Sequence, residues 1–173
     1  PPRSSLVAAL LVVSTLRAVA CSTATTDGVS LATANGPAGC IYQLGVTTGT
    51  SPTTYAPSNV VTRAQMAAFL ARFYGIVTGL DCAGDTPFVD VPSGAYYTEA
   101  VGCIYNLGIT TGTSQTTYAP NNVVTRAQMA AFLARLYSTL TETTCTGTHP
   151  FVDVSLTVYF SGSVGCIYNL GIT

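Results

Sequence analysis

The chain of 173 residues is 48% apolar but only 8% charged, and its formal net charge is −1. The apolar share is ordinary for a folded domain, whereas soluble domains usually carry about 25% charged residues. All basic residues are arginine, and lysine is absent. This composition excludes disorder driven by high charge. It also argues against a nucleic-acid-binding protein, because such proteins usually present a basic face.

Residues 1–20 have two interpretations. Arg3, the apolar run at 6–13 and an Ala-Val-Ala end before Cys21 are typical of a secretory signal peptide. The same apolar residues also follow the 3.6-residue spacing of a degenerate helix. A lipid-anchor signal ending at Cys21 fits less well, because Ala18 stands where such signals usually carry Leu. The run is too short and too interrupted to cross a bilayer, so no transmembrane span is predicted.

A repeat of 63 residues begins at Gly39. Residues 39–74 and 102–137 are identical at 31 of 36 positions, and residues 88–110 and 151–173 at 15 of 23. Such a period indicates tandem structural units. Before Gly39 the match fails, through divergence of the first copy or a reading-frame error. We expect a fragment of a longer repeat protein, made of residues 1–20 and three repeats at 21–81 (first half divergent), 82–144 and 145–173 (truncated).

Each unit is predicted to contain two helices. The first runs from about 97 to 107, and Gly108 suits a left-handed C-terminal cap. The second begins at Thr125, because Thr-Arg-Ala-Gln at 125–128 has the form of a capping box. Apolar residues then follow at i, i+3, i+4 and i+7, which gives that helix one apolar face.

Two further segments connect these helices. Residues 110–124 form a loop rich in Thr, Gly, Pro and Asn, which Tyr118 and Pro120 are expected to pin against the helices. Phe-Val-Asp-Val at 88–91 is expected to be short and extended, because Pro92 biases Val91 away from helix. A single helical pair cannot bury both of its faces, so neighbouring units must pack into a bundle.

The six cysteines recur with the repeat, and their spacings alternate between short and long: Cys21, Cys40, Cys82, Cys103, Cys145 and Cys166. Disulfides, a metal site and free buried thiols are all open interpretations. Repeat symmetry favours disulfides, and it selects one pairing out of the fifteen that six cysteines allow. Zinc would need clustered cysteines or several histidines, and His149 is the only histidine. The expected pairs are Cys21–Cys40, Cys82–Cys103 and Cys145–Cys166, which would indicate an oxidising, extracellular setting.

Five short motifs occur in a fixed order in the second unit. They are Phe-Val-Asp-Val-Pro at 88–92, the pair Tyr96-Tyr97, Gly-Ile-x-x-Gly at 108–112, Tyr-Ala-Pro at 118–120 and Val-Thr-Arg-Ala-Gln at 124–128. Together they resemble an S-layer homology repeat of the type seen in secreted actinobacterial proteins. The resemblance covers residues 39–173 well and the first 38 residues poorly.

This resemblance implies a fold and a function. S-layer homology repeats are mainly α-helical, and three of them form a pseudo-threefold bundle with grooves between the units. They are non-catalytic modules that hold secreted proteins on the bacterial cell wall by binding secondary cell-wall polysaccharide, often with pyruvylated sugars. The partners implied are that polysaccharide or a peptidoglycan-linked glycan, and other repeats of the full-length chain. No enzyme activity, cofactor or metal is expected.

The resemblance also implies a set of groove residues. They are the arginine of the Thr-Arg-Ala motif, the aspartate of the Phe-x-Asp-Val segment, the aromatics after it and a loop glycine. In this sequence they are Arg63, Arg126, Asp90, Asp153, Tyr96, Tyr97, Tyr159, Gly49 and Gly112. An arginine fork suits a sugar carboxylate. A structural role is equally open for Arg126, as an ion-pair partner, for Asp90, as a cap, and for Tyr96 and Tyr97, as packing residues.

Three departures from the family pattern leave the bound sugar open. Gln128 replaces the usual Glu, Tyr replaces the common Trp, and a cysteine-bearing insertion lengthens each unit. Two other functions compete with glycan anchoring. The repeats could be the anchor of a secreted enzyme whose catalytic domain lies outside this sequence, or a structural array that self-associates without binding glycan.

Overall fold

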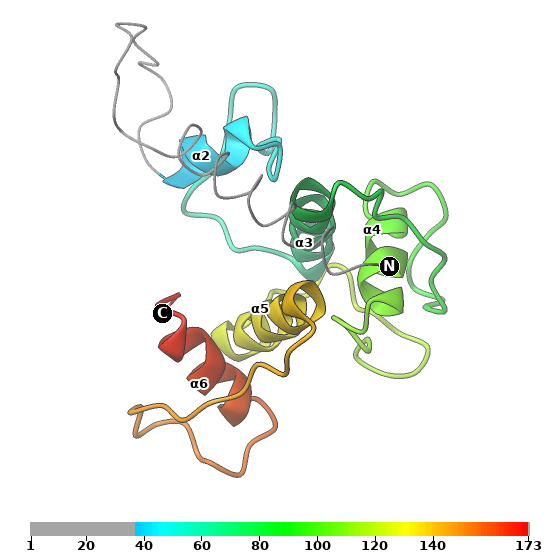
Figure 1. Cartoon of the computed structure of the whole chain (residues 1–173). Coiled ribbons are helices and arrows are strands. Elements are labelled where there is room, and N and C mark those ends of the chain that lie inside the picture. Colours follow the sequence, from blue (N-terminus) through cyan, green and yellow to red (C-terminus); the bar gives the residue numbers. More distant parts are fainter. Residues whose placement is uncertain (1–36, 173) are drawn as a thin grey trace, which may run out of the picture. The chain divides into compact units, whose positions relative to one another are not determined.

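The computed structural model describes residues 37–172, and its regular structure is helical, with no strand among those residues. The prediction of a mainly α fold is confirmed. Predictions that concern residues 1–36, including the signal peptide and Cys21, lie outside the described residues. The helices are α2 (Pro37–Gln43), α3 (Arg63–Thr78), α4 (Thr98–Asn106), α5 (Arg126–Thr141) and α6 (Ser161–Asn169) (Figure 1).

The chain divides into two compact units. Within the described residues, one consists of 37–59 with Arg72–Asp81, and the other of Val60–Ala71 with 82–172. The first half of α3 therefore belongs with α4, α5 and α6, and this second unit holds most of the buried residues described here. The pseudo-threefold arrangement and the repeat boundaries stay predictions.

Helix α5 begins where its capping box predicts. The Thr125 hydroxyl accepts from the Gln128 N–H at 3.2 Å, and the Gln128 side chain accepts from the Thr125 N–H at 3.2 Å. Thr62 and Gln65 make the same reciprocal pair at the start of α3, at 3.3 and 2.9 Å. The predicted left-handed glycine after α4 is also present, because Gly108 has φ 71°.

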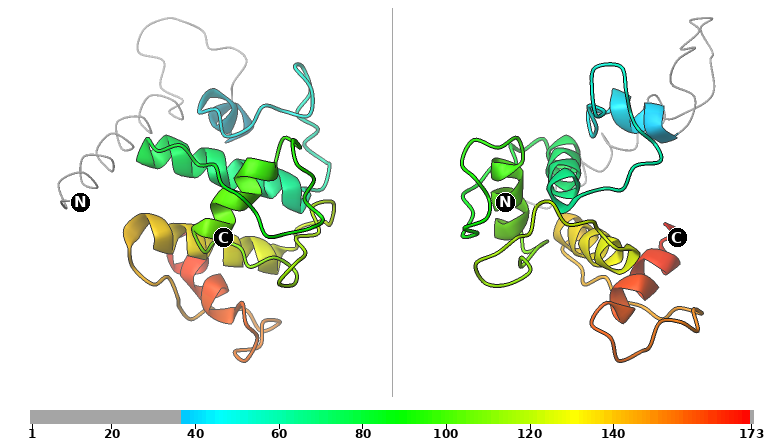
Figure 2. Two further views of the ribbon diagram at one scale, coloured as in Figure 1. Left: turned by 90° about the vertical axis from the view of Figure 1, so that its right-hand side faces the viewer. Right: turned by 180° about the vertical axis from the view of Figure 1, so that it is seen from behind.

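Helices α5 and α6 pack against each other (Figure 2). Their shared core is formed by Ala130, Ala134, Cys166 and Ile167, with Leu133, Cys145 and Val164 at its edge. The alanines on α5 allow the close approach, and they also favour the helix itself.

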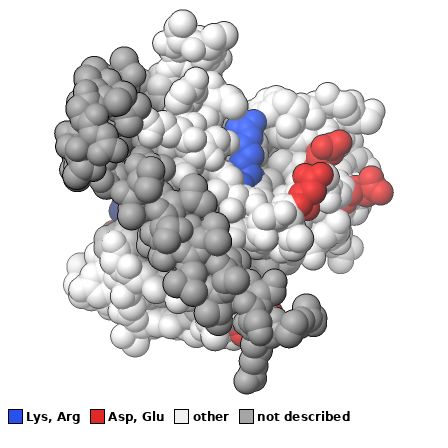
Figure 3. Space-filling view, turned by 45° about the horizontal axis from the view of Figure 1, so that its top comes forward, with Lys and Arg blue, Asp and Glu red and all other residues white. Residues whose placement is uncertain are grey.

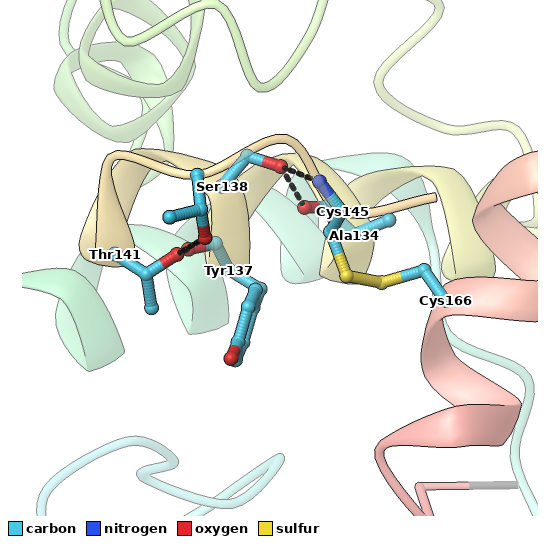
Figure 4. The surroundings of a disulfide bond; sticks show 7 residues. Ala134, Tyr137, Ser138, Thr141, Cys145 and Cys166 are labelled. Atoms are coloured by element: carbon cyan, nitrogen blue, oxygen red, sulfur yellow. Dashed lines mark hydrogen bonds between the residues drawn. A yellow bond between two sulfur atoms is a disulfide. The ribbon is translucent and has the colours of Figure 1, made fainter. Parts of the chain in front are cut away.

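Disulfide bonds tie the segment before each short helix to that helix. Cys82 joins Cys103 and Cys145 joins Cys166, with Cα–Cα distances of 5.4 Å in both pairs. Near the second bond, the Ser138 hydroxyl of α5 accepts from the Cys145 N–H and donates to the Ala134 carbonyl, both at 2.9 Å (Figure 4). The expected pair Cys21–Cys40 involves Cys21, which lies outside the described residues.

Each of these crosslinked segments crosses its helix at a glycine. A Cβ on Gly102 of α4 would overlap the Gly84 carbonyl, and a Cβ on Gly165 of α6 would overlap the Gly147 carbonyl. The glycine before each cysteine of these helices is therefore required by close backbone contact.

The expected extended segment at 88–91 is instead a turn. The Val91 N–H donates to the Phe88 carbonyl at 3.2 Å and closes it. The reason lies in the loop that follows α4, because the Val89 N–H donates to the Thr116 carbonyl at 2.9 Å, which fixes where the chain turns. Among residues 37–172, no helix is long and apolar enough to cross a membrane.

Replacing Gly102 by Ala should destabilise the fold by about 1–3 kcal/mol, because the added methyl forces the 82–88 segment off α4. Chemical denaturation followed by circular dichroism measures this change. Glu99→Ala on the same helix is the control, since Glu99 is exposed. Equal stability of Gly102→Ala and the control would contradict the close contact.

Candidate functional site

The largest fully buried side chain of the described residues is Tyr118, at 0% exposure. It belongs to the loop between α4 and α5, as the sequence predicts. Its ring centroid lies 4.5 Å from the guanidinium carbon of Arg63 and 5.6 Å from the ring centroid of Phe88. The tyrosine thus pins the loop against the first turn of α3 and the 88–91 turn.

Arg63 is buried as deeply, at 3% exposure, although it is charged. Its Nε donates to the Tyr118 carbonyl at 2.6 Å, and the Tyr118 hydroxyl donates to the Arg63 carbonyl at 2.9 Å. The guanidinium also faces Phe132 of α5 at 5.6 Å. Its Nη2 has no hydrogen-bond partner within the described part of the chain. Two aromatic faces therefore provide much of this cation's stabilisation.

Asp90 holds the loop from the other side. Its two carboxylate oxygens accept from the N–H groups of Tyr118 and Ala119, at 2.8 and 2.7 Å. Ala119 has φ 55°, a left-handed conformation that costs energy for a residue with a Cβ. The paired hydrogen bonds to a charged acceptor offset that cost. We call Arg63, Asp90 and the loop 110–120 the tyrosine lock.

A short backbone pairing completes the tyrosine lock. The Arg63 N–H donates to the Asn122 carbonyl at 2.8 Å, and the Ala64 N–H to the Pro120 carbonyl at 2.9 Å. The Val124 N–H donates to the Val61 carbonyl at 3.0 Å. The free N–H groups at the start of α3 thus find acceptors in the loop that precedes α5.

Burial dominates the electrostatics of the tyrosine lock. It lowers the pKa of Arg63, while Tyr118 and Asp90 act against that shift through their charge interactions. Burial also raises the pKa of Tyr118 to about 12, and the nearby Arg63 charge opposes this rise. The structure therefore favours a neutral phenol beside a buried cation.

Arg126 and Asp153, the same positions one repeat later, have a different environment. Both side chains are exposed. Both line one hollow of about 560 Å³ at the start of α5. Of the predicted groove residues, the structure thus brings together Arg63 with Asp90, Arg126 with Asp153, and Tyr96 with Tyr97. Tyr159 is also close enough to Arg63 to act on the pKa of Arg63.

The predicted aromatic positions lie on the surface. Tyr96 is 66% exposed and Tyr159 73%, at the starts of α4 and α6. Tyr96 packs edge-to-face with Tyr97 at 5.0 Å, and Tyr159 with Phe160 at 5.1 Å. The face drawn in Figure 3 carries few charged side chains among the uncharged ones.

Gly49 and Gly112 shape their loops. Their φ angles are 76° and 79°. A Cβ on Gly112 would meet the carbonyl oxygens of Ser114 and Thr117 at 2.6 Å. Both glycines therefore have a structural reason to be glycine.

Phe132, the second ring that faces Arg63, was not among the predicted site residues. Phe69 occupies the same position in the earlier copy. The helical spacing of Phe132 in the sequence indicates only a core residue. In residues 37–172, no cluster of His, Cys, Asp and Glu is arranged to hold a metal.

Arg63 and Arg126 form a matched pair for testing the tyrosine lock. Arg63→Ala should lower the free energy of unfolding by about 2–4 kcal/mol, because it leaves a cavity and the buried Tyr118 carbonyl unpaired. Arg126→Ala should change it by less than about 0.5 kcal/mol, as for other exposed residues. Urea titration of both variants measures the difference, and equal losses would contradict the buried role of Arg63.

The tyrosine lock should also give a pH dependence. Because the pKa of Tyr118 rises from 10.0 to about 12 on folding, the folded state holds this proton more tightly than the unfolded chain. The resulting stability is present below pH 10 and is lost as the pH rises towards 12. Unfolding measured across this range should show a steeper fall for the native chain than for Tyr118→Phe, and equal slopes would contradict the burial effect.

The match to a known protein family falls within the first and second repeats of the chain. A family model described as the S-layer homology domain matches residues 41–67 and 87–130. An endoglucanase of Bacillus sp. (strain KSM-635) is 40% identical over 100 residues, which are 58% of this chain and 10% of that protein. An amylopullulanase of Thermoanaerobacterium thermosulfurigenes is 35% identical over 94 residues, 54% of this chain and 5% of that protein.

A third relative is a surface-layer 125 kDa protein of Lysinibacillus sphaericus. It is 30% identical over 93 residues, which are 54% of this chain and 8% of that protein. The chain thus spans a tenth or less of the length of these relatives. The family match and the surface-layer relative confirm the prediction of a cell-surface location. Residues 41–67 and 87–130 are thus S-layer homology repeats, as the sequence predicts.

Proposed function

We propose that this chain is a non-catalytic module that anchors its protein to the bacterial cell envelope by binding secondary cell-wall polysaccharide. The observation that carries the proposal is an aromatic pair at the start of a short helix, with its first ring exposed, present in two successive repeats. These pairs are Tyr96-Tyr97 before α4 and Tyr159-Phe160 before α6.

The geometry of these pairs suits a sugar ring. Tyr96 and Tyr159 each present an exposed ring whose partner packs against it edge-to-face. The face of an aromatic ring is electron-rich and attracts the positively polarised C–H groups of a sugar. A ring held by its neighbour loses little freedom on binding, which favours affinity.

The tyrosine lock removes Arg63 and Asp90 from the set of residues that we propose to bind glycan. Arg63 and Asp90 make their hydrogen bonds within the fold, and burial of Arg63 hides its guanidinium from a surface ligand. We therefore assign the primary glycan contact to the aromatic positions Tyr96, Tyr97 and Tyr159. A ligand with a carboxylate, such as a pyruvylated sugar, would need a second contact with a cation.

The relatives fit an anchoring role. Two of them are polysaccharide-degrading enzymes by name and a third is a surface-layer protein, yet this chain spans a tenth or less of each. A module that is attached to other domains is expected to occur as a shared segment in proteins of such different names. We infer that the module serves as the anchor of whichever protein carries it, including a secreted enzyme.

Co-sedimentation of the chain with purified cell-wall sacculi tests this function. The chain should bind sacculi that carry their secondary polysaccharide and should not bind the same sacculi after acid removes it. The double variant Tyr96→Ala/Tyr159→Ala should bind at least about tenfold more weakly, equivalent to about 1.4 kcal/mol.

The matched control is Tyr42→Ala, since Tyr42 is an exposed tyrosine of α2 that belongs to neither pair. This variant should bind as the native chain does. Equal binding to intact and stripped sacculi would contradict polysaccharide recognition. Unchanged binding of the double variant would contradict the aromatic site.

A further inference from the structure

Each aromatic pair that we propose as a glycan site ends a loop that leads into a short helix. The loop before α4 contains Tyr96-Tyr97, and the loop before α6 contains Tyr159-Phe160. The two loops occupy equivalent positions in the repeat, and both belong to the second compact unit. An exposed ring has few packing contacts, so its position depends on how its loop is held.

A side-chain hydrogen bond closes the loop before α4. The Thr98 hydroxyl donates to the Pro92 carbonyl at 2.6 Å, across the segment that carries Tyr96. The Pro92 carbonyl also accepts from the Ala95 N–H at 3.4 Å, and the Thr98 N–H donates to the Ala95 carbonyl at 3.0 Å. Gly94, with φ 81°, lies inside this loop and adds backbone freedom that closure must restrict. Thr98 therefore joins the two ends of the loop.

The loop before α6 is closed by a different hydrogen bond. The hydroxyl of Ser161, the residue equivalent to Thr98, pairs with Nε2 of His149 at 3.2 Å. The His149 ring stacks on Phe151, with ring centroids 5.7 Å apart and the ring planes at 19°. Ser161 is only 6% exposed, which shields this hydrogen bond from water. The bond joins the chain on either side of Tyr159.

The sequence explains why the two loops are closed differently. His149 occupies the position of Thr86 in the second repeat, where the side chain is shorter. The Thr86 hydroxyl makes a local contact instead, and accepts from the Phe88 N–H at 3.3 Å. Both repeats nevertheless keep a hydroxyl at the first residue of the short helix, Thr98 in α4 and Ser161 in α6. In each repeat that hydroxyl ties the helix to the chain before the aromatic pair.

We propose that Thr98 and the His149–Ser161 pair are positioning residues for glycan binding. Each holds one aromatic pair in the orientation that receives a sugar ring, and acts through that pair rather than by touching the glycan. A loop that is already closed loses less conformational freedom when the glycan binds, so closure raises affinity. The inference rests on the proposed function and extends it, because it assigns a separate determinant to each pair.

Binding to sacculi in two single-pair backgrounds tests this inference. Tyr159→Ala leaves only the pair at Tyr96, and Tyr96→Ala leaves only the pair at Tyr159. In the first background Thr98→Val should weaken binding about threefold to tenfold, the range expected from one lost hydrogen bond. Thr98→Ser keeps the hydroxyl and should bind like that background.

The second background should give the reciprocal result. There Ser161→Ala should weaken binding by a similar factor. Ser163→Ala, the same replacement two residues later on α6, is the control and should have no effect. Crossing the changes separates positioning from general stability. Thr98→Val should leave binding through the Tyr159 pair unchanged, and Ser161→Ala should leave binding through the other pair unchanged.

Equal losses in both backgrounds would indicate general destabilisation and would overturn the inference. So would unchanged binding of Thr98→Val in its own background. The Thr98 hydrogen bond is exposed, so circular dichroism should show that this variant stays folded. A native chain that does not bind sacculi would overturn the proposed function and this inference together. A native chain that binds, without the crossed pattern, would overturn the inference alone.

Discussion

The structure of the described repeats depends on one buried contact, in which Tyr118 lies between Arg63 and Asp90. Arg63 and Tyr118 are 55 residues apart, so the contact joins the helix of one repeat to the loop of the next. A buried arginine is costly unless it is well compensated. Here a short hydrogen bond and two aromatic rings offset the cost of burying the Arg63 charge. The same contact buries the Tyr118 side chain of the loop.

This contact gives two of the few charged residues of the chain, Arg63 and Asp90, a structural role. A sequence with 8% charged residues repeats an arginine at 63 and 126 and an aspartate at 90 and 153, which first suggests a sugar-acid site. In the one repeat junction that the structure describes in full, both are used by the fold. The surface that we propose for a cell-wall glycan is then the set of aromatic pairs that begin with the exposed Tyr96 and Tyr159, which repeats with the same period.

The sequence predicts local features well because local chemistry decides them. The capping boxes at Thr62 and Thr125, the left-handed Gly108 and the pinning role of Tyr118 all follow from short motifs. Arg63 and Arg126 show the limit of this approach. Val-Thr-Arg-Ala-Gln surrounds both, yet one is buried and the other exposed, because burial depends on a loop far along the chain. The 88–91 turn was missed for the same reason, since the Asp90 carboxylate binds residues 28 and 29 positions later.

A double-mutant cycle between Arg63 and Tyr118 tests this account most directly. Arg63→Met removes the guanidinium and Tyr118→Leu removes the aromatic ring, and both replacements are apolar. Each hydrogen bond between the two residues ends on a main-chain carbonyl that the partner substitution keeps, so the coupling reports the cation–ring contact. The free energies of unfolding of the two single variants and the combined variant should show a coupling of about 1–3 kcal/mol, as expected for residues in direct contact. Additive effects, with a coupling below about 0.5 kcal/mol, would show that the two residues stabilise the fold independently and would contradict the account.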